Sequence, residues 1–191
     1  MARVFVITGP SGVGKGTLIR RLREAIPELR LSVSATTRKP RPGEAHGRDY
    51  WFLDDAEFAR RVEAGDFVEH AEYAGRRYGT LREELDRHLA DGAPVVLEIE
   101  VQGAQQVRGT MPEAIQVFVV PPSFEELRER LESRGTDDPE VVQRRLEVSR
   151  GELRQQEQFD HRIVNDDLER ATDELVGLVR EHLAEAHRTA H

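Results

Sequence analysis

The chain has 191 residues, of which 38% are hydrophobic and 34% are charged, so it can form one domain around a single core with a strongly solvated surface. It contains no cysteine, which excludes disulfides, thiolate metal sites and cysteine nucleophiles, and no apolar run approaches the ~20 residues that a membrane helix needs. The net charge of -8 argues against nucleic acid as the main partner, and we expect a cytoplasmic protein without membrane or obligate protein partners.

The first predicted elements are a strand, a glycine-rich turn and a helix. The apolar run Val4–Thr8 indicates the strand, and helical spacing of apolar side chains begins at Leu18. Between them lie Gly9, Pro10, Ser11, Gly12, Val13, Gly14, Lys15, Gly16 and Thr17. This order is typical of a P-loop, in which glycines let backbone amides approach a phosphate group and a lysine neutralises it. We therefore predict that these nine residues bind ATP, with Lys15 as a catalytic cation.

The end of this loop departs from the common P-loop pattern. A hydroxyl residue usually follows the lysine directly, whereas here Gly16 follows it and Thr17 comes one position later. The Lys-Gly-Thr order resembles the loop of adenylate kinases. Thr17 is the candidate ligand for a Mg²⁺ ion bound with ATP, but the shifted order leaves open which hydroxyl, if any, contacts the metal.

The pattern of residues 32–83 predicts an inserted subdomain of short strands, because aromatic side chains are interspersed there with prolines and glycines. Arg38 and Arg41 lie three residues apart in a proline-rich stretch and can converge on one phosphate group. Further along, Glu69 offers a carboxylate and the run Tyr78-Gly79-Thr80 offers hydroxyls. These groups suit a nucleoside monophosphate. The chain is therefore predicted to have one site for ATP and one for a phosphate acceptor.

The rest of the chain alternates strands and helices. Further strands are predicted at Val95–Val101, Ile115–Val120 and Arg162–Val164. The spacing Ser123-x-x-Glu126 is a capping box that begins a helix, and a last amphipathic helix starts at Leu168. This alternation predicts an α/β fold with a parallel sheet flanked by helices.

Two segments near the C-terminus carry further expectations. Residues 134–150 place charge on most faces of a helix, which suits a mobile lid better than a core helix. The histidines of the last helix, His182, His187 and His191, are expected to be exposed tail residues, since the seven histidines show no zinc-like spacing with other ligands.

Seven motifs run in order from residue 9 to residue 167: G-P-S-G-V-G-K, S-x-T-T-R-x-P-R-x-G-E, D-Y-x-F, E-H-A-E-Y-x-x-x-x-Y-G-T, V-Q-G, R-G-T-D and I-V-N-D-D. In this series the sequence resembles guanylate kinases, the enzymes that phosphorylate GMP. The resemblance implies one domain over 1–191 with a P-loop NTPase core, an inserted mixed α/β GMP-binding subdomain and a helical lid. The implied bounds are 1–33, 84–133 and 151–191 for the core, 34–83 for the insertion and 134–150 for the lid.

The same resemblance implies roles for particular residues. The GMP phosphate would be held by Arg38, Arg41, Tyr50 and Tyr78, and guanine would be read by Ser34, Glu69 and Thr80, with Gly79 and Glu100 also in the GMP site. The catalytic cations would be Lys15, Arg38, Arg130, Arg134 and Arg145. Asn165 and Asp166 would lie near the adenine of ATP, although Asn165 could equally cap the last helix.

Two of these acidic residues can be argued from their chemistry. The Glu69 carboxylate can accept hydrogen bonds from guanine N1–H and the 2-amino group, whereas adenine offers neither donor. A site built in this way can reject the wrong base by roughly 10⁴–10⁵. Glu100 stands where the family usually has aspartate in I-D-V-Q-G, and its extra methylene moves the charge by ~1.5 Å, so it could keep the family role through a bridging water.

The implied activity is transfer of the γ-phosphoryl group from ATP to GMP with Mg²⁺, without a covalent protein intermediate. One alternative is a kinase for another phosphorylated acceptor, suggested by the Gly16-Thr17 order. The other is a non-catalytic binding module, because guanylate-kinase-like domains also serve as interaction scaffolds. Glu69 counts against the first alternative, and the retained Lys15 counts against the second.

Overall fold

A computed structural model describes residues 3–73, 75–133 and 139–189. The chain divides into two compact units. One consists of Ile7–Pro27 and Ile115–His191, together with Met1, and the other of Ala2–Val6 and Glu28–Ala114. Strands and helices alternate along the chain, and a parallel sheet flanked by helices is accompanied by a second, mixed sheet. The predicted α/β fold class is therefore confirmed.

The larger sheet has five strands in the order β2-β7-β1-β8-β9. Strand β1 (Val4–Thr8) passes from one unit into the other, and β8 (Ile115–Val120) and β9 (His161–Val164) belong to the first unit. The strands β8 and β9 are parallel, with Val117 opposite His161. All residues of β1 and β8 are buried, which explains why both read as continuous apolar runs in the sequence.

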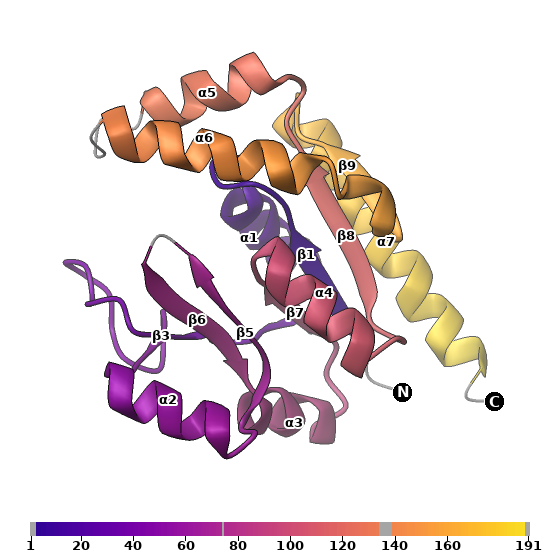
Figure 1. The fold of residues 1–191 in the computed structure, drawn as a ribbon. Coiled ribbons are helices and arrows are strands. Elements are labelled where there is room, and N and C mark those ends of the chain that lie inside the picture. Colours follow the sequence, from indigo (N-terminus) through magenta and orange to yellow (C-terminus); the bar gives the residue numbers. More distant parts are fainter. Residues whose placement is uncertain (1–2, 74, 134–138, 190–191) are drawn as a thin grey trace. The chain divides into compact units, whose positions relative to one another are not determined.

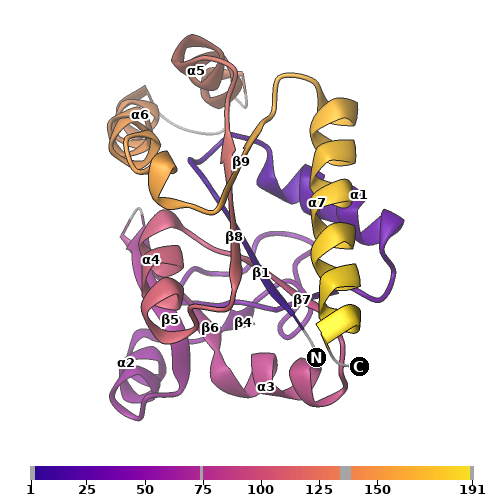
Figure 2. The same ribbon diagram turned by 90° about the vertical axis from the view of Figure 1, so that its right-hand side faces the viewer.

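The helices of the first unit follow its strands. They are α1 (Lys15–Ala25), α5 (Phe124–Glu132), α6 (Pro139–Leu153) and α7 (Leu168–Thr189), with a short 3₁₀ turn at Gln156–Gln158. Helix α1 packs against α7, and the two lie side by side in Figure 2. Helix α5 packs against α6 (Figure 1). Ser123 caps α5, since its Oγ accepts a hydrogen bond from the Glu126 amide at 3.1 Å, which confirms the predicted start of this helix.

The second unit contains two strands of the larger sheet and the whole of the second sheet. The strands β2 (Arg30–Leu31) and β7 (Val95–Glu98) are parallel neighbours in the larger sheet. The second sheet has the order β4-β3-β6-β5, with bounds Trp51–Phe52, Ala35–Thr36, Arg76–Leu81 and Phe67–Tyr73. The strand β6 is antiparallel to both β3 and β5. Because β5 is the last strand in this order, one of its edges is not covered by the sheet.

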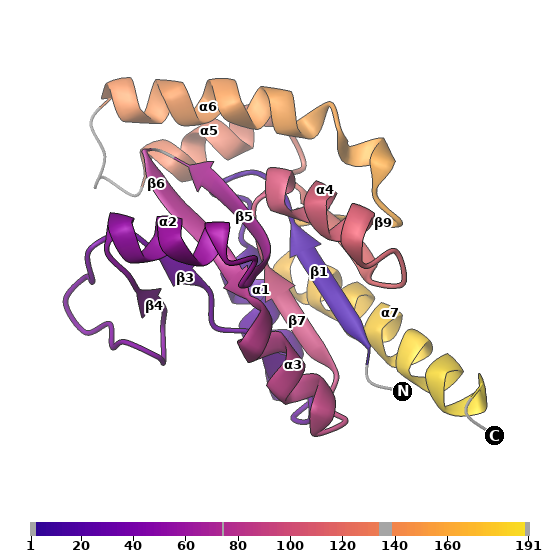
Figure 3. The ribbon, with the colours of Figure 1, turned by 60° about the horizontal axis from the view of Figure 1, so that its bottom comes forward.

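The helices of the second unit are α2 (Asp55–Glu63), α3 (Arg82–Ala90) and α4 (Val101–Thr110). Helix α2 packs against β5 (Figure 3), and its Phe58 joins Ala35, Phe67 and Leu81 in a small buried core. Helix α4 also packs against β5 (Figure 1). Residues 32–83 therefore contain a helix in addition to the predicted short strands. Asp54 begins it, because its carboxylate accepts a hydrogen bond from the Glu57 amide at 2.7 Å.

Two expectations from the sequence are wrong in detail. The strand predicted over Val95–Val101 ends at Glu98, because Glu100 already occupies the N-cap of α4. Helix α6 does not end at residue 150 but extends to Leu153, and the one face that is not charged buries Val142 and Leu146. The part of the lid prediction at 134–138 lies outside the described residues.

The expectation for His182 is also wrong. Its side chain is 22% exposed and contacts Glu185. The Nε2 atoms of His182 and His161 are 3.1 Å apart. The His187 side chain and His191 lie outside the described part of the chain. No helix within the described ranges is long and apolar enough to cross a membrane.

Candidate active site

The loop after β1 lies close to its neighbours in the first unit because two of its glycines lack a side chain. Gly9 and Gly14 have φ angles of 140° and 100°, in the region that glycine alone adopts readily. A Cβ atom at Gly9 would lie less than 3.0 Å from the Val119 carbonyl oxygen, and one at Gly14 would lie 2.5 Å from Asn165 Nδ2. The backbone of the loop can therefore approach both β8 and the β9–α7 connection.

The N-terminus of α1 is open to an anion. Its N-cap residue is Gly14, which offers no side-chain cap, and its first turn contains no acidic residue. The unpaired amides and the helix dipole favour negative charge at this position. Lys15 is the first helical residue, and its ammonium group donates to the Gly9 carbonyl at 2.5 Å and the Pro10 carbonyl at 3.2 Å. The lysine thus lies over the same loop that the helix amides face.

Asn165 and Arg130 hold the loop from the outside. The buried Asn165 donates through Nδ2 to the Val13 carbonyl at 2.8 Å, and Arg130 approaches the same carbonyl at 3.4 Å. Arg130 also donates to the Asn165 carbonyl at 2.9 Å and pairs with Glu126. Asn165 does not cap α7, because that helix begins at Leu168 and the residue before it, Asp167, accepts from the Arg170 amide.

The other residues predicted for ATP or its phosphates are less enclosed. Asp166 is about half exposed and pairs with Arg170, which lowers the pKa of its carboxyl. Gly16 and Thr17 are exposed on the first turn of α1, and Arg145 is half-buried on α6. The prediction for Arg134 lies outside the described residues.

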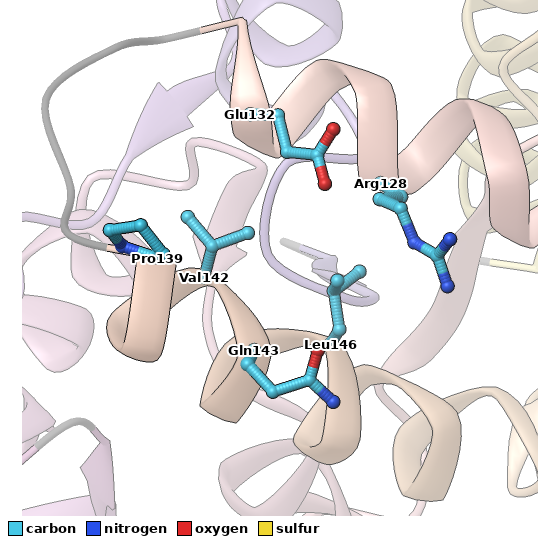
Figure 4. Close-up of a pocket in the computed structure, with 6 residues that line it drawn as sticks. All are labelled: Arg128, Glu132, Pro139, Val142, Gln143 and Leu146. Atoms are coloured by element: carbon cyan, nitrogen blue, oxygen red, sulfur yellow. The ribbon is translucent and has the colours of Figure 1, made fainter.

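A cavity of about 560 Å³ lies between α5 and α6 (Figure 4). It is lined from α5 by Arg128 and Glu132 and from α6 by Pro139, Val142, Gln143 and Leu146. None of the described residues that are predicted to bind a nucleotide lines it. The arginines predicted to act on phosphate, Arg130 and Arg145, belong to the same two helices.

In the second unit, Glu69 is a buried carboxylate on β5 with a defined partner. It is 3% exposed, faces Thr80 across the β5–β6 pair, and accepts a hydrogen bond from the Thr80 hydroxyl at 2.8 Å. Burial raises the pKa of the Glu69 carboxyl to about 7, with a smaller contribution from Glu100, while the Thr80 hydrogen bonds oppose the rise. The carboxylate is thus poorly solvated, and its charged form is disfavoured in the ligand-free chain.

Ser34 and Gly79 lie close to this carboxylate in the sheet. Ala35 of β3 pairs with Gly79 of β6, so continuing the antiparallel register by one residue places Ser34 opposite Thr80. A Cβ atom at Gly79 would lie 2.7 Å from the Phe67 ring and 2.8 Å from the Glu69 carbonyl oxygen. The predicted guanine-reading residues Ser34, Glu69 and Thr80 are therefore brought to one level of three neighbouring strands.

The predicted phosphate-binding residues gather around Arg38. Its guanidinium lies 5.1 Å from the Tyr50 ring centroid, and the Tyr50 and Tyr78 rings are 6.2 Å apart. Burial raises the pKa of the Tyr50 phenol, so it remains a neutral hydroxyl. Arg41 is exposed and contributes its backbone amide to Glu44 at 2.7 Å.

Glu44 is a residue whose role sequence reasoning missed. Its two carboxylate oxygens accept from two nitrogens of Arg38, each at 2.9 Å, which raises the pKa of the arginine and lowers that of Glu44. Glu44 ends the motif S-x-T-T-R-x-P-R-x-G-E, so the signal for its importance was present. The pair holds the Arg38 guanidinium beside the Tyr50 ring in the ligand-free chain.

Glu100 follows β7 and occupies the N-cap of α4, but its side chain does not cap the helix. Within the described part of the chain, its Oε2 atom is buried and accepts no hydrogen bond. Such an acceptor suits a ligand hydroxyl or a hydrated cation. Among the described residues, no group of three or more histidine or acidic side chains could hold a metal ion by itself.

Comparison with known proteins agrees with this arrangement. A family model described as guanylate kinase matches residues 1–182. A guanylate kinase of Thermobifida fusca is 54% identical over 177 residues, which cover 93% of this chain and 90% of that relative. One from Synechococcus sp. (strain CC9311) is 55% identical over 175 residues, covering 92% of each chain. The crystal structure of guanylate kinase from Anaplasma phagocytophilum matches with a TM-score of 0.77 at 34% identity, covering 95% of this chain and 86% of that one.

Proposed function

Since the chain belongs to the guanylate kinase family, we propose that the loop around Lys15 holds ATP and that the Glu69 and Arg38 groups hold GMP. The chain is a nucleoside monophosphate kinase, which transfers the γ-phosphoryl group of ATP to GMP and yields ADP and GDP. The roles of individual residues in this reaction are the proposal.

The observation that carries the GMP assignment is the buried Glu69 carboxylate. It accepts a hydrogen bond from the Thr80 hydroxyl, and a carboxylate has acceptor capacity for further donors. Guanine offers two adjacent donors, N1–H and the 2-amino group, and binding both favours the ionised carboxylate that burial disfavours. Adenine would instead place its N1 lone pair against the carboxylate. The buried carboxylate would then lack a hydrogen-bond donor, which costs about 1–3 kcal/mol, or more because the group is charged.

The phosphate of GMP is assigned to the group formed by Arg38, Tyr50 and Tyr78. Arg38 already lies beside Tyr50 and Tyr78, and the exposed Arg41 is free to turn toward the same anion. Arginine suits this task because its planar fork can donate two parallel hydrogen bonds to phosphate oxygens. When GMP binds, one of the two Arg38 N–H groups that donate to Glu44 would donate to the phosphate instead, since a phosphate dianion competes with the carboxylate for the same donors.

The phosphates of ATP are assigned to the first unit. The loop amides and the uncapped N-terminus of α1 would bind the β- and γ-phosphates, and Lys15 would exchange its carbonyl partners for phosphate oxygens. Asn165 and Asp166 would lie at the adenine end. Arg130, Arg134 and Arg145 would neutralise charge on the transferring group, together with Lys15 and Arg38.

The chemistry asks for positioning and charge neutralisation. A phosphate oxygen of GMP attacks the γ-phosphorus of ATP, the bond to the β–γ bridging oxygen breaks, and that oxygen leaves on ADP. No covalent bond to the protein forms. A Mg²⁺ ion bound with ATP, for which Thr17 is the candidate protein ligand, would neutralise phosphate charge. Exclusion of water by lid residues would protect ATP from hydrolysis.

The test is ADP formation from ATP with GMP, dGMP, IMP, AMP, UMP and CMP as acceptors, for the natural chain and Lys15→Ala. We expect GMP to be preferred, and the variant to lose at least ~10²-fold in kcat, the scale of one lost charge-stabilising group, with little change in Tm. Arg20→Ala on the same helix is the control, because Arg20 is exposed and pairs with Glu24 on the surface. A Lys15→Ala enzyme as active as Arg20→Ala would refute the ATP assignment.

A further inference from the structure

Gly103 lies against the carboxylate of Glu69. It is the third residue of α4, directly after Val101 and Gln102. A Cβ atom built on Gly103 would lie 2.9 Å from the carboxyl carbon of Glu69 and closer still to Oε2, which is nearer than real Cβ contacts come. Gly103 has no positive φ angle, so its backbone conformation does not require glycine. The space taken by the Glu69 carboxylate is therefore what excludes a side chain at this position.

Gln106, one turn further along α4, fixes the strand that carries Glu69. Its side-chain oxygen accepts from the His70 amide at 3.1 Å, and its side-chain nitrogen donates to the His70 carbonyl at 2.6 Å. These are the two backbone groups with which β5, the outer strand of its sheet, would otherwise pair with another strand. The backbone next to Glu69 is thereby tied to α4 at a set distance.

Thr80 completes the arrangement from the other side. Its hydroxyl donates to Glu69 Oε1, while Oε2 lies beside Gly103. The carboxylate plane is thus set by a donor on β6 and by the surface of the first turn of α4, where the helix dipole favours negative charge. With the backbone held by Gln106, the side chain cannot move away from α4 without leaving Thr80.

We propose that Gly103 is a specificity-determining positioning residue: the bare first turn of α4, held on β5 by Gln106, aligns the Glu69 carboxylate for guanine. This inference rests on the proposed role of Glu69 in reading guanine. Gly103 acts through Glu69 and need not touch the substrate. A methyl group at position 103 would turn the carboxylate out of alignment with N1–H and the 2-amino group.

The first test compares Gly103→Ala with Gly109→Ala. Gly109 lies on the same helix, and a Cβ atom there would meet nothing within 4 Å, so both variants gain the same helix propensity and only one meets Glu69. For Gly103→Ala we expect KM for GMP to rise at least tenfold and the GMP-to-AMP ratio of kcat/KM to fall at least tenfold. KM for ATP should stay within twofold. Gly109→Ala should match the natural chain in all three.

The second test places Gly103→Ala in a Glu69→Ala background. If the methyl group acts only through the carboxylate, it should lower kcat/KM for GMP by less than twofold there, and any loss of Tm caused by Gly103→Ala should be recovered. Recovery of Tm is informative even if the single variant folds poorly. An equal penalty in both backgrounds, or a Gly103→Ala enzyme with the GMP-to-AMP ratio of Gly109→Ala, would overturn the proposal.

The two levels of inference fail differently. If Glu69→Ala leaves the GMP-to-AMP ratio unchanged, the proposed reading of guanine by Glu69 is wrong, and the role of Gly103 falls with it. If Glu69→Ala lowers the ratio but Gly103→Ala does not, Glu69 reads guanine and only the positioning role of Gly103 is refuted.

Discussion

At the scale of single residues, Glu69 combines burial with a need for charge. It is 3% exposed, and the Thr80 hydrogen bond does not compensate fully for lost hydration, so its pKa rises to about 7. In the absence of a ligand the carboxyl therefore binds a proton at a pH where an unfolded glutamate has lost it. Guanine binding would favour release of that proton. The burial proposed to serve base selection therefore lowers the stability of the ligand-free fold as the pH rises from ~4.5 toward 7.

This cost predicts a pH dependence of stability. Because the folded-state pKa of about 7 lies above the unperturbed 4.5, the folded chain binds more protons than the unfolded chain between these values. The free energy of unfolding should therefore fall as pH rises from ~4.5 to ~7, by at most about 3 kcal/mol from this group. Urea titrations of the natural chain and Glu69→Gln at pH 4.5–8 would reveal it, because the difference should grow in favour of the variant. Parallel curves would contradict the burial argument.

Residue roles differ in how far they can be predicted from sequence. The loop from Gly9 to Thr17 is recognisable because phosphate binding by backbone amides demands glycine at particular spacings. No comparable requirement of the local backbone marks Glu44 in the sequence. Its function depends on the side chain of Arg38 folding back over six residues, which no periodic pattern encodes.

At the scale of elements, the loop before α1 is held by contacts from segments far along the chain. Asn165, after β9, donates to the Val13 carbonyl, and Arg130 on α5 bonds both residues. The motif I-V-N-D-D is therefore explained in part by support of the loop, in addition to any contact with adenine. Asn165 proves not to be a helix cap, because Asp167 holds that position.

We expect Asn165→Ala to weaken ATP binding more than its effect on stability would suggest. The lost buried hydrogen bond should cost about 1–2 kcal/mol of stability and raise KM for ATP at least fivefold, with KM for GMP little changed. Ser123→Ala serves as the control, since loss of the α5 cap should cost about 1 kcal/mol without acting on the loop. Equal KM values for ATP in the two variants would show that Asn165 contributes only to stability.

Element ends and helix faces were the least predictable features. Apolar residues continue past Glu98, where β7 ends, but α4 begins at Val101. Val101 and Ala104 are buried on one face of this helix, so they are apolar because of helix packing and not because the strand continues. Charge was expected on most faces of α6, and the structure shows that Val142, Leu146 and Ser149 share its buried side. Their spacing of three and four residues is hard to recognise because charged residues such as Arg144, Arg145 and Glu147 stand between them.

At the scale of the whole molecule, alternation of strands and helices was enough to predict the α/β class. The division of the chain into two compact units was not encoded in any linker or change of composition. The proposed ATP residues belong to the first unit and the proposed GMP residues to the second. The chain carries a net charge of -8 while both substrates are polyanions, so arginines from separate segments must gather around the phosphates. Whether 34–83 and 134–150 move as distinct bodies stays a prediction.

Binding of both nucleotides is therefore expected to make the molecule more compact. Small-angle scattering should give a smaller radius of gyration with a non-hydrolysable ATP analogue plus GMP than without ligand, approaching about 16 Å for a compact chain of this length. Either nucleotide alone should produce a smaller change. Identical scattering curves at saturation would contradict a closing mechanism.

The central claim, that Glu69 selects guanine for phosphorylation by ATP, is tested most directly by kcat/KM for GMP and AMP in the natural chain and Glu69→Gln. In the variant an amide nitrogen faces a guanine donor, which should cost about 2–4 kcal/mol, or ~30- to 1000-fold in kcat/KM for GMP. The value for AMP should not fall, because repulsion at adenine N1 is removed, and KM for ATP should not change. Equal losses for both bases, or no loss for GMP, would contradict the account.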